Sequence, residues 1–210
     1  MDRNKYDVIR LKMERTAEAL RDNNMYCECV DSIEEALEVV ESMLNDGDTV
    51  AVGGSMTLEE IGVLDLLRGG RYNFLDRYEN GADVQKIFRD SFSADVYLTS
   101  SNAITEDGEL YNVDGNGNRV AAMTFGPKAV IVVAGYNKIV KDIDAAKVRV
   151  QEIAAPANAT RLSCETPCTK TGHCMNCASP RRICATAVIM GRQRVQNRVK
   201  VILVGEELGY

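Results

Sequence analysis

The run Ala129-Val-Ile-Val-Val-Ala134 constrains the fold of this 210-residue chain more than any other segment. Its side chains are all apolar and mostly β-branched, and it is far shorter than the ~20 residues that a membrane-spanning helix needs. Such a run is typical of a strand that is buried on both faces of a parallel sheet. Because helices cover both faces of a sheet of that kind, the run predicts an α/β fold.

The rest of the chain alternates between helical and strand patterns. Apolar residues from Tyr6 to Leu20 recur at three- and four-residue steps, which predicts an N-terminal helix. Ser32 followed by Glu35 is a capping box and predicts the start of a second helix. Further elements are expected as strands at 25–30, 72–75, 95–99 and 200–204, helices at 83–91 and 142–153, and a hairpin between 109–112 and 119–123.

A glycine turn links the strand predicted at 48–52 to a helix. The turn contains Gly53, Gly54, Ser55 and Thr57. At the carboxyl end of a parallel strand, the helix N-terminus offers free backbone N–H groups to an anion, and the glycines let a ligand approach. The hydroxyls can cap the helix or bond a phosphate or carboxylate. We therefore predict a ligand-binding turn, with an ordinary turn before a capped helix as the alternative.

A second group of polar residues follows the strand that ends at Thr99. Asn102, Glu106 and Asp107 should face the same crevice as the glycine turn, because both segments leave carboxyl ends of parallel strands. We predict Glu106 as base or nucleophile, Asn102 as a ligand-orienting amide and Asp107 as a turn residue that could also act in catalysis. Lys138, beyond the 129–134 strand, is expected to steer an anionic substrate.

Five of the seven cysteines lie in one short segment, and they are Cys164, Cys168, Cys174, Cys177 and Cys184. Closely spaced pairs let thiolates converge on one ion. The spacing leaves open an iron–sulfur cluster, a zinc ion, or unligated or redox-active thiols. We expect at least three of the last four cysteines to bind one metal centre, with Cys164 as the alternate ligand and His173 as a loop residue beside them.

Composition and charge bound the class of protein. The net charge of −6 argues against nucleic-acid binding. The N-terminal residues lack the apolar segment of a signal peptide, and no apolar run is long enough for a membrane span, so a cytoplasmic protein with reduced thiols is expected. We predict one α/β domain at 1–155, a cysteine-rich metal-binding insertion at 156–185, and the closing strand of the same domain at 186–210.

Several segments together resemble the lactate-utilisation (LUD) domain family. They are Val-Ala-Val-Gly-Gly-Ser-Met-Thr-Leu-Glu-Glu-Ile-Gly (50–62), Ser-Asn-Ala-Ile-Thr-Glu-Asp-Gly (101–108), Gly-Asn-Arg-Val-Ala-Ala (117–122), Phe-Gly-Pro-Lys-Ala-Val-Ile-Val-Val-Ala-Gly-Tyr-Asn-Lys-Ile-Val (125–140) and Val-Ile-Leu-Val-Gly-Glu-Glu-Leu-Gly (201–209). The resemblance implies a three-layer fold with a parallel sheet, similar to the superfamily of sugar-phosphate isomerases, glucosamine-phosphate deaminases and CoA-transferases. It matches Gly53, Gly54, Ser55 and Thr57 to the ligand-binding turn of that superfamily, and it matches Asn102, Glu106 and Asp107 to its acidic loop.

The resemblance also implies a link to bacterial L-lactate oxidation, with iron–sulfur proteins as partners. The first function we expect is therefore a part in the oxidation of lactate or a similar hydroxy acid, with a cluster relaying electrons. A second is an acyl- or phosphate-ligand transferase or isomerase, with Glu106 as nucleophile or base and a structural metal. A third is a non-catalytic protein that binds a small anion or responds to redox state.

Overall fold

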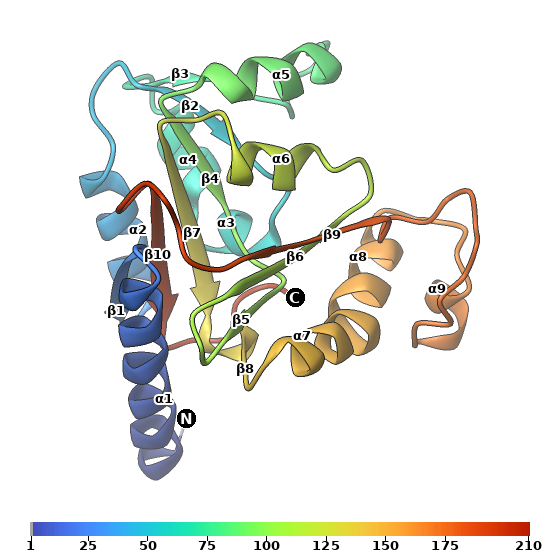
Figure 1. Ribbon diagram of the computed structural model, residues 1–210. Coiled ribbons are helices and arrows are strands. Elements are labelled where there is room, and N and C mark those ends of the chain that lie inside the picture. The colour runs from blue at the N-terminus through green and yellow to red at the C-terminus, as the bar shows by residue number, and fades with distance from the viewer. Residues whose placement is uncertain (1) are drawn as a thin grey trace.

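The computed structural model describes residues 2–210 and has a parallel sheet at its centre (Figure 1). The six strands lie in the order β1-β10-β7-β4-β2-β3, and every neighbouring pair is parallel. The strands are β1 (Tyr26–Val30), β2 (Thr49–Val52), β3 (Asn73–Phe74), β4 (Val96–Thr99), β7 (Ala129–Gly135) and β10 (Val199–Val204). The predicted α/β class with a parallel sheet is confirmed.

Strand β7 is buried on both faces, as its apolar run predicts. Val130 and Val132 pack into the hydrophobic cluster on one face of the sheet, whereas Ile131 and Val133 pack into the cluster on the other. All four side chains are fully buried. Successive residues of a strand point to opposite faces, so a run without polar residues supplies both layers at once.

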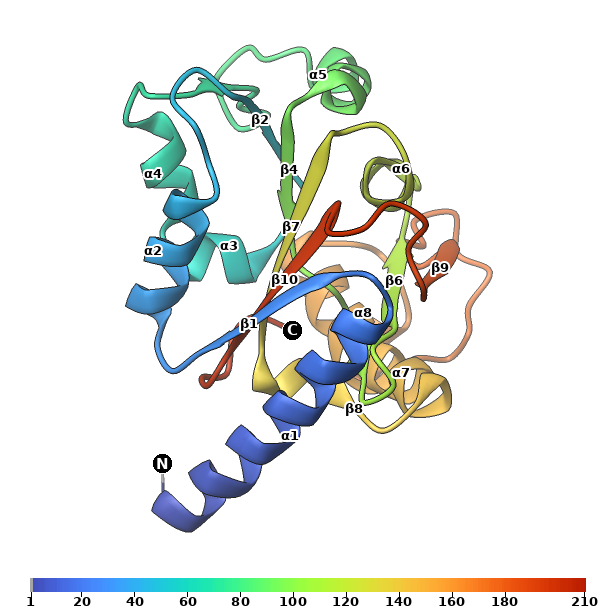
Figure 2. The same ribbon diagram turned by 60° about the vertical axis from the view of Figure 1, so that its left-hand side comes forward.

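Helices cover one face of the sheet, and helices with a second sheet cover the other (Figure 2). The first layer contains α2 (Ile33–Ser42), α3 (Met56–Glu60) and α4 (Val63–Arg68). The opposite layer contains α1 (Arg3–Asp22) and α6 (Asn118–Thr124). The predicted cap of α2 is present, because the Ser32 hydroxyl accepts a hydrogen bond from the Glu35 N–H at 3.2 Å. Helix α5 (Val84–Asp90) and the 3₁₀ turn η1 (Ser91–Ser93) precede β4.

The second sheet replaces the hairpin predicted between 109–112 and 119–123. Its strands are β8 (Ile139–Val140), β5 (Ala103–Thr105), β6 (Leu110–Asp114) and β9 (Thr186–Met190), in that order across the sheet. The hairpin is formed by β5 and β6 instead. Residues 119–123 belong to α6, because Gly117 takes a left-handed conformation (φ 74°) and the Asp114 carboxylate accepts the N–H of Val120 at 3.0 Å. The glycine-rich turn therefore begins a helix.

The helix predicted to end near residue 153 continues to Arg161. Helix α7 (Ile143–Arg149) passes through a π-helical turn, η3 (Val150–Ala154), into α8 (Ala155–Arg161). Pro156 comes directly after the π-helical turn and, because it has no N–H, it donates no hydrogen bond within this continuous helix.

Residues 162–185 then project from the body on the right of Figure 1 and contain one short helix, α9 (Cys168–Thr171). The chain returns through β9 to the second sheet and through β10 to the first.

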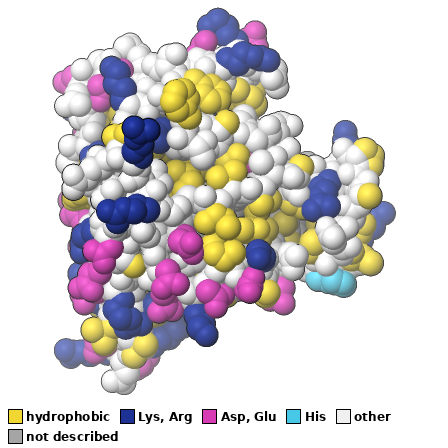
Figure 3. Space-filling model, in the orientation of Figure 1, with side chains coloured by type: hydrophobic (Ala, Val, Ile, Leu, Met, Phe, Trp, Pro, Cys, Tyr) yellow, Lys and Arg dark blue, Asp and Glu magenta, His cyan; other side chains and the backbone are white. Residues whose placement is uncertain are grey.

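Strand β9 is the edge of the second sheet and runs across the face shown in Figure 3. Hydrophobic side chains gather near the middle of this face, and Ile189 of β9 is 49% exposed. Among residues 2–210, no helix has both the length and the apolar character that crossing a membrane requires.

Candidate functional site

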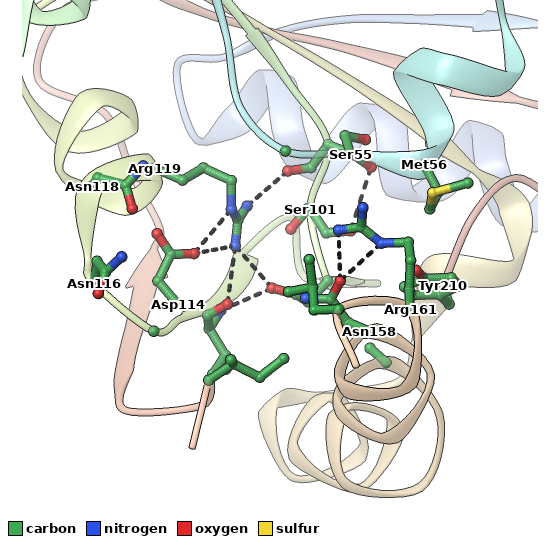
Figure 4. A pocket seen from close by; sticks show the side chains of 18 of the residues that line it. Ser55, Met56, Ser101, Asp114, Asn116, Asn118, Arg119, Asn158, Arg161 and Tyr210 are labelled. Atoms are coloured by element: carbon green, nitrogen blue, oxygen red, sulfur yellow. Dashed lines mark hydrogen bonds and ion pairs between the residues drawn. The ribbon is translucent and has the colours of Figure 1, made fainter. Parts of the chain in front are cut away.

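The carboxyl ends of β2, β4 and β7 meet at a pocket of about 230 Å³ (Figure 4). The turn after β2 supplies Gly54 and Ser55, and the segment after β4 supplies residues 100–102. Lys138 comes from η2 (Tyr136–Lys138), the 3₁₀ turn after β7. Ligands of α/β proteins bind outside the carboxyl ends of neighbouring parallel strands, so the pocket lies where the fold predicts a site.

Lys138 is the central titratable group of the pocket. Its side-chain Nζ donates hydrogen bonds to Thr57 Oγ1 at 2.8 Å and to Ser100 Oγ at 2.9 Å. The residue is only 2% exposed. Burial, together with the nearby charges of Arg149 and Arg119, lowers the pKa of Lys138 to about 7. The amine is therefore divided between its neutral and charged forms near neutral pH, which suits a proton acceptor or donor.

Arg119 organises the pocket wall from α6. Its guanidinium contacts Asp114 Oδ1 at 2.8 and 2.9 Å and Asn102 Oδ1 at 3.0 Å (Figure 4). It also donates to Asn112 Oδ1 at 2.6 Å and to the Ser100 carbonyl at 3.0 Å. These contacts join the end of β4 to β6. Because Asp114 balances its charge, Arg119 holds neighbouring groups in position.

Two other arginines give the pocket positive charge that no carboxylate balances. Arg77 and Arg161 line the pocket, and within residues 2–210 neither forms an ion pair. Arg161 is held by Asn158, whose Oδ1 accepts its Nη2–H at 2.8 Å (Figure 4). The buried hydroxyl of Tyr210, another lining residue, has no hydrogen-bond partner among the described residues. These donors favour a small anion.

The structure brings together most of the residues predicted around the glycine turn. Gly54, Ser55, Asn102 and Lys138 line the pocket directly. The Thr57 side chain lies behind the pocket and orients Lys138. Ser55 also caps α3 through the N–H of Leu58, at 3.3 Å.

Glu106 and Asp107 lie outside the pocket, so their predicted place in the same crevice is wrong. The Glu106 carboxylate is 3.4 Å from Lys12 Nζ and 3.5 Å from Arg15 Nη2, both on α1. The Asp107 carbonyl accepts a hydrogen bond from Asn23 Nδ2 at 3.0 Å. Strand β5 separates them from Asn102, and three residues of strand carry the chain ~10 Å.

Five residues that line the pocket come from distant segments and were not predicted from sequence patterns. They are Arg77, Arg119, Asn158, Arg161 and Tyr210. No spacing rule joins such positions, because the tertiary fold alone brings them together. The one local signal is the stretch from Asp114 to Arg119, whose glycines are also typical of hairpin turns.

The cysteines divide into two groups in the projecting segment. Cys168, Cys174, Cys177 and Cys184 line a second, small cavity, whereas Cys164 does not. All seven thiols of the chain are free. As the structure stands, no three histidine, cysteine or acidic side chains within residues 2–210 are placed to hold a metal ion. His173 is exposed.

Gly53 and Gly54 should respond differently to replacement by alanine. A β-carbon at buried Gly53 would lie 2.8 Å from Thr99 Oγ1 and 3.0 Å from Arg119 Cδ, so Gly53→Ala should destabilise the fold by ~1–3 kcal/mol. At Gly54 the nearest atom would be Arg77 Nη2, at 3.4 Å on a flexible side chain, so Gly54→Ala should affect anion binding more than stability. Urea unfolding and ligand titration of both variants check this, and equal losses of stability would contradict it.

Comparisons with known proteins agree with this architecture. The LUD domain family model matches residues 13–204. No curated protein matches the chain. A duf162 family protein from Deinococcus radiodurans is 14% identical over 93% of this chain and 98% of its own, and its TM-score of 0.54 indicates a shared fold. A second structure, eIF2B delta from Chaetomium thermophilum, is 21% identical over 52% of this chain and 49% of its own, with a TM-score of 0.34 that is too low to support an inference.

Proposed function

Because the chain belongs to the LUD domain family, we propose that its pocket binds a small hydroxy acid such as lactate and that the protein takes part in the oxidation of this ligand. The pocket volume of about 230 Å³ is below the range typical of drug-sized ligands, which suits a small molecule. The two arginines without carboxylate partners, Arg77 and Arg161, would hold the carboxylate.

The observation that carries this proposal is the buried Lys138, whose pKa lies at about 7. The neutral amine would accept the hydroxyl proton of the substrate. The hydrogen on the adjoining carbon would leave as a hydride to a two-electron acceptor of the flavin class on a partner protein, which yields a keto acid, a reduced acceptor and a protonated Lys138. The LUD family's link to lactate oxidation supports an iron–sulfur protein that would carry the electrons onward from that acceptor one at a time.

A second candidate is an enzyme that acts on an acyl or phosphate ligand. The observation that favours it is the same pair of arginines, since guanidinium groups bind phosphate in a bidentate manner as well as carboxylate. Lys138 would then serve as acid or base in transfer or isomerisation. The two candidates differ in the ligand that should bind most tightly.

Calorimetric titration with L-lactate, pyruvate, inorganic phosphate and coenzyme A tests the proposal. We expect L-lactate to bind, and Arg161→Met to weaken its binding by about tenfold or more, because a hydrogen bond to a charged group is lost. Glu106→Gln is the matched control and should leave affinity unchanged, since Glu106 pairs with α1 away from the pocket.

Turnover separates the candidates further. Oxidation of L-lactate with an artificial electron acceptor supports the proposal. Binding of phosphate or coenzyme A in preference to L-lactate would favour the transferase or isomerase, and binding of L-lactate without turnover would favour a binding protein. Failure of every anion to bind would remove the pocket as the functional site.

A further inference from the structure

Four cysteines from separate turns of the projecting segment line one cavity. Cys168 is the first residue of α9, Cys174 and Cys177 lie in the following loop, and Cys184 lies just before β9. The cavity holds about 20 Å³, which is room for one water-sized particle or ion. Most of its other lining is apolar, so the four sulfur atoms are the main groups that could bind an occupant.

Hydrogen-bond donors already point at two of these sulfur atoms. The N–H of Asn176 donates to Cys174 Sγ at 3.3 Å, which is possible because Asn176 takes a left-handed conformation (φ 46°) that folds the chain back on the sulfur. The Thr166 hydroxyl lies 3.2 Å from Cys168 Sγ, where it can donate. Donors of this kind stabilise a thiolate, which is the form that binds metals.

Arg182 joins the two turns that carry the other cysteines. Its Nη1 donates to the Cys177 carbonyl and its Nε to the Cys184 carbonyl, each at 2.8 Å. Arg182 also lines the cavity, and its positive charge lies near the Cys184 thiol. Arg182 therefore holds the turn that contains Cys177 close to the turn that contains Cys184.

We propose that Cys168, Cys174, Cys177 and Cys184 bind a single tetrahedral metal ion as thiolates, and that this ion fixes one wall of the anion pocket. A four-thiolate set is typical of structural zinc, and the small cavity fits one ion better than a cluster of several. The thiols are not at coordinating positions within the described residues, so binding requires the turns to close around the ion. The energy of ligation would then stabilise the segment.

Ile183 connects the two cavities. It stands between Arg182 and Cys184 and lines both the cysteine cavity and the anion pocket. Its backbone packs on Gly115, where a β-carbon would come within 3.3 Å of Ile183 Cα. Nearby, the Ala185 N–H donates to the Asp114 carbonyl at 2.9 Å. Closing the thiolates on an ion would therefore fix the residues that border Asp114 in the pocket.

Helix α8 forms a second connection. Its residues Ala155 and Ala159 face the cysteine cavity, whereas Asn158 and Arg161 face the anion pocket. A change in the position of the four cysteines would therefore act on the same helix that carries Arg161. This part of the inference rests on the proposed function, because it requires an anion to bind in the pocket.

Metal analysis of the purified full chain tests whether the four cysteines bind one metal ion. We expect about one zinc ion per chain, tetrahedral absorption bands when cobalt(II) is added to chelator-treated protein, and loss of the metal in Cys174→Ser and Cys177→Ser. Cys164→Ser is the matched control and should keep its metal, since Cys164 lies outside the cavity. Wild-type protein that binds neither ion, or full metal content in Cys174→Ser and Cys177→Ser, would overturn the site. Purified protein that contains iron and inorganic sulfide would overturn the proposal of a single ion.

Hydrogen exchange of wild-type protein with and without zinc tests the connection between the cysteine cavity and the anion pocket. This measurement needs no ligand in the pocket. Zinc should slow exchange at Ala185 and in residues 113–116, and it should tighten the binding of L-lactate about tenfold, a common size for coupling between two sites. Unchanged exchange in the zinc-bound protein would overturn the connection. If L-lactate binds neither form while exchange slows, the proposed function fails and the connection stands.

Discussion

Lys138→Met is expected to lower hydroxy-acid turnover by about 10²–10⁴-fold, the contribution typical of a positioned acid or base. Methionine keeps an unbranched side chain as far as the ε position and removes the amine that contacts Thr57 and Ser100. The wild-type rate should rise with pH through about 7, because only the neutral amine accepts a proton and the pKa of Lys138 is about 7. Steady-state rates across this pH range provide the measurement.

Lys128→Met is the control for this prediction, since Lys128 is an exposed lysine that pairs with Asp95 away from the pocket. It should retain the wild-type rate and pH profile. Wild-type turnover in Lys138→Met would place the chemistry elsewhere.

The same lysine should make stability depend on pH. Its folded-state pKa of about 7 is below the value of ~10.4 for an unfolded lysine, so between these values the unfolded chain binds a proton that the folded chain does not. The contribution of Lys138 to the free energy of unfolding should therefore fall as pH is lowered from about 10 to 7 and stay constant below 7. Urea unfolding at both pH values should show a difference that Lys138→Met removes.

Arg119→Met should destabilise the protein by about 3–5 kcal/mol, because it leaves the buried Asp114 carboxylate without its partner. Side-chain exposure is 11% for Arg119 and 6% for Asp114, so water cannot replace the lost contacts. The carbonyl of Ser100 and the side-chain oxygen of Asn112 would lose a donor as well. The free energy of unfolding in urea gives the measurement.

Two further variants test whether the loss of stability in Arg119→Met comes from the unpaired Asp114 carboxylate or would follow the removal of any arginine. Arg71→Met removes an exposed arginine that pairs with Asp46 and Glu41, and it should cost less than about 1 kcal/mol. Adding Asp114→Asn to Arg119→Met should restore part of the lost stability, because no unpaired charge then remains buried. A loss in Arg119→Met as small as that in Arg71→Met would contradict the role of Arg119.

Sequence patterns predicted the elements whose formation depends only on residues close in the sequence. The apolar run of β7 and the Ser32 cap of α2 each depend on neighbouring residues, and both are present in the structure. The hairpin prediction failed because helix α6 follows the glycine-rich turn, and the Val120 N–H in its first turn donates to the Asp114 carboxylate. Periodicity carries no information on such a side-chain contact.

The pocket residues that directly follow strands of the parallel sheet were predicted from the sequence. The pocket residues that come from distant segments were not. Lys138 follows β7 and the glycine turn follows β2, the two strands on either side of β4, and both reach the pocket. Glu106 also follows a strand of the parallel sheet, but β5 joins the second sheet and carries it to α1. The cysteine spacing indicated a shared site, whereas the fold separates Cys164 from the four cysteines that line the cavity.

The position of β10 in the sheet has a consequence for how the chain folds. Strand β10 comes last in the sequence but lies between β1 and β7, and β1 is an edge strand whose neighbour is β10. During synthesis from the N-terminus, β1 must therefore wait until the residues up to Val204 have been made before it can pair. We expect β7, β4 and β2 to associate first through shorter connections, and α1 with β1 to join them only when β10 inserts. Any ribosome-bound fragment that lacks β10 should leave α1 open to protease.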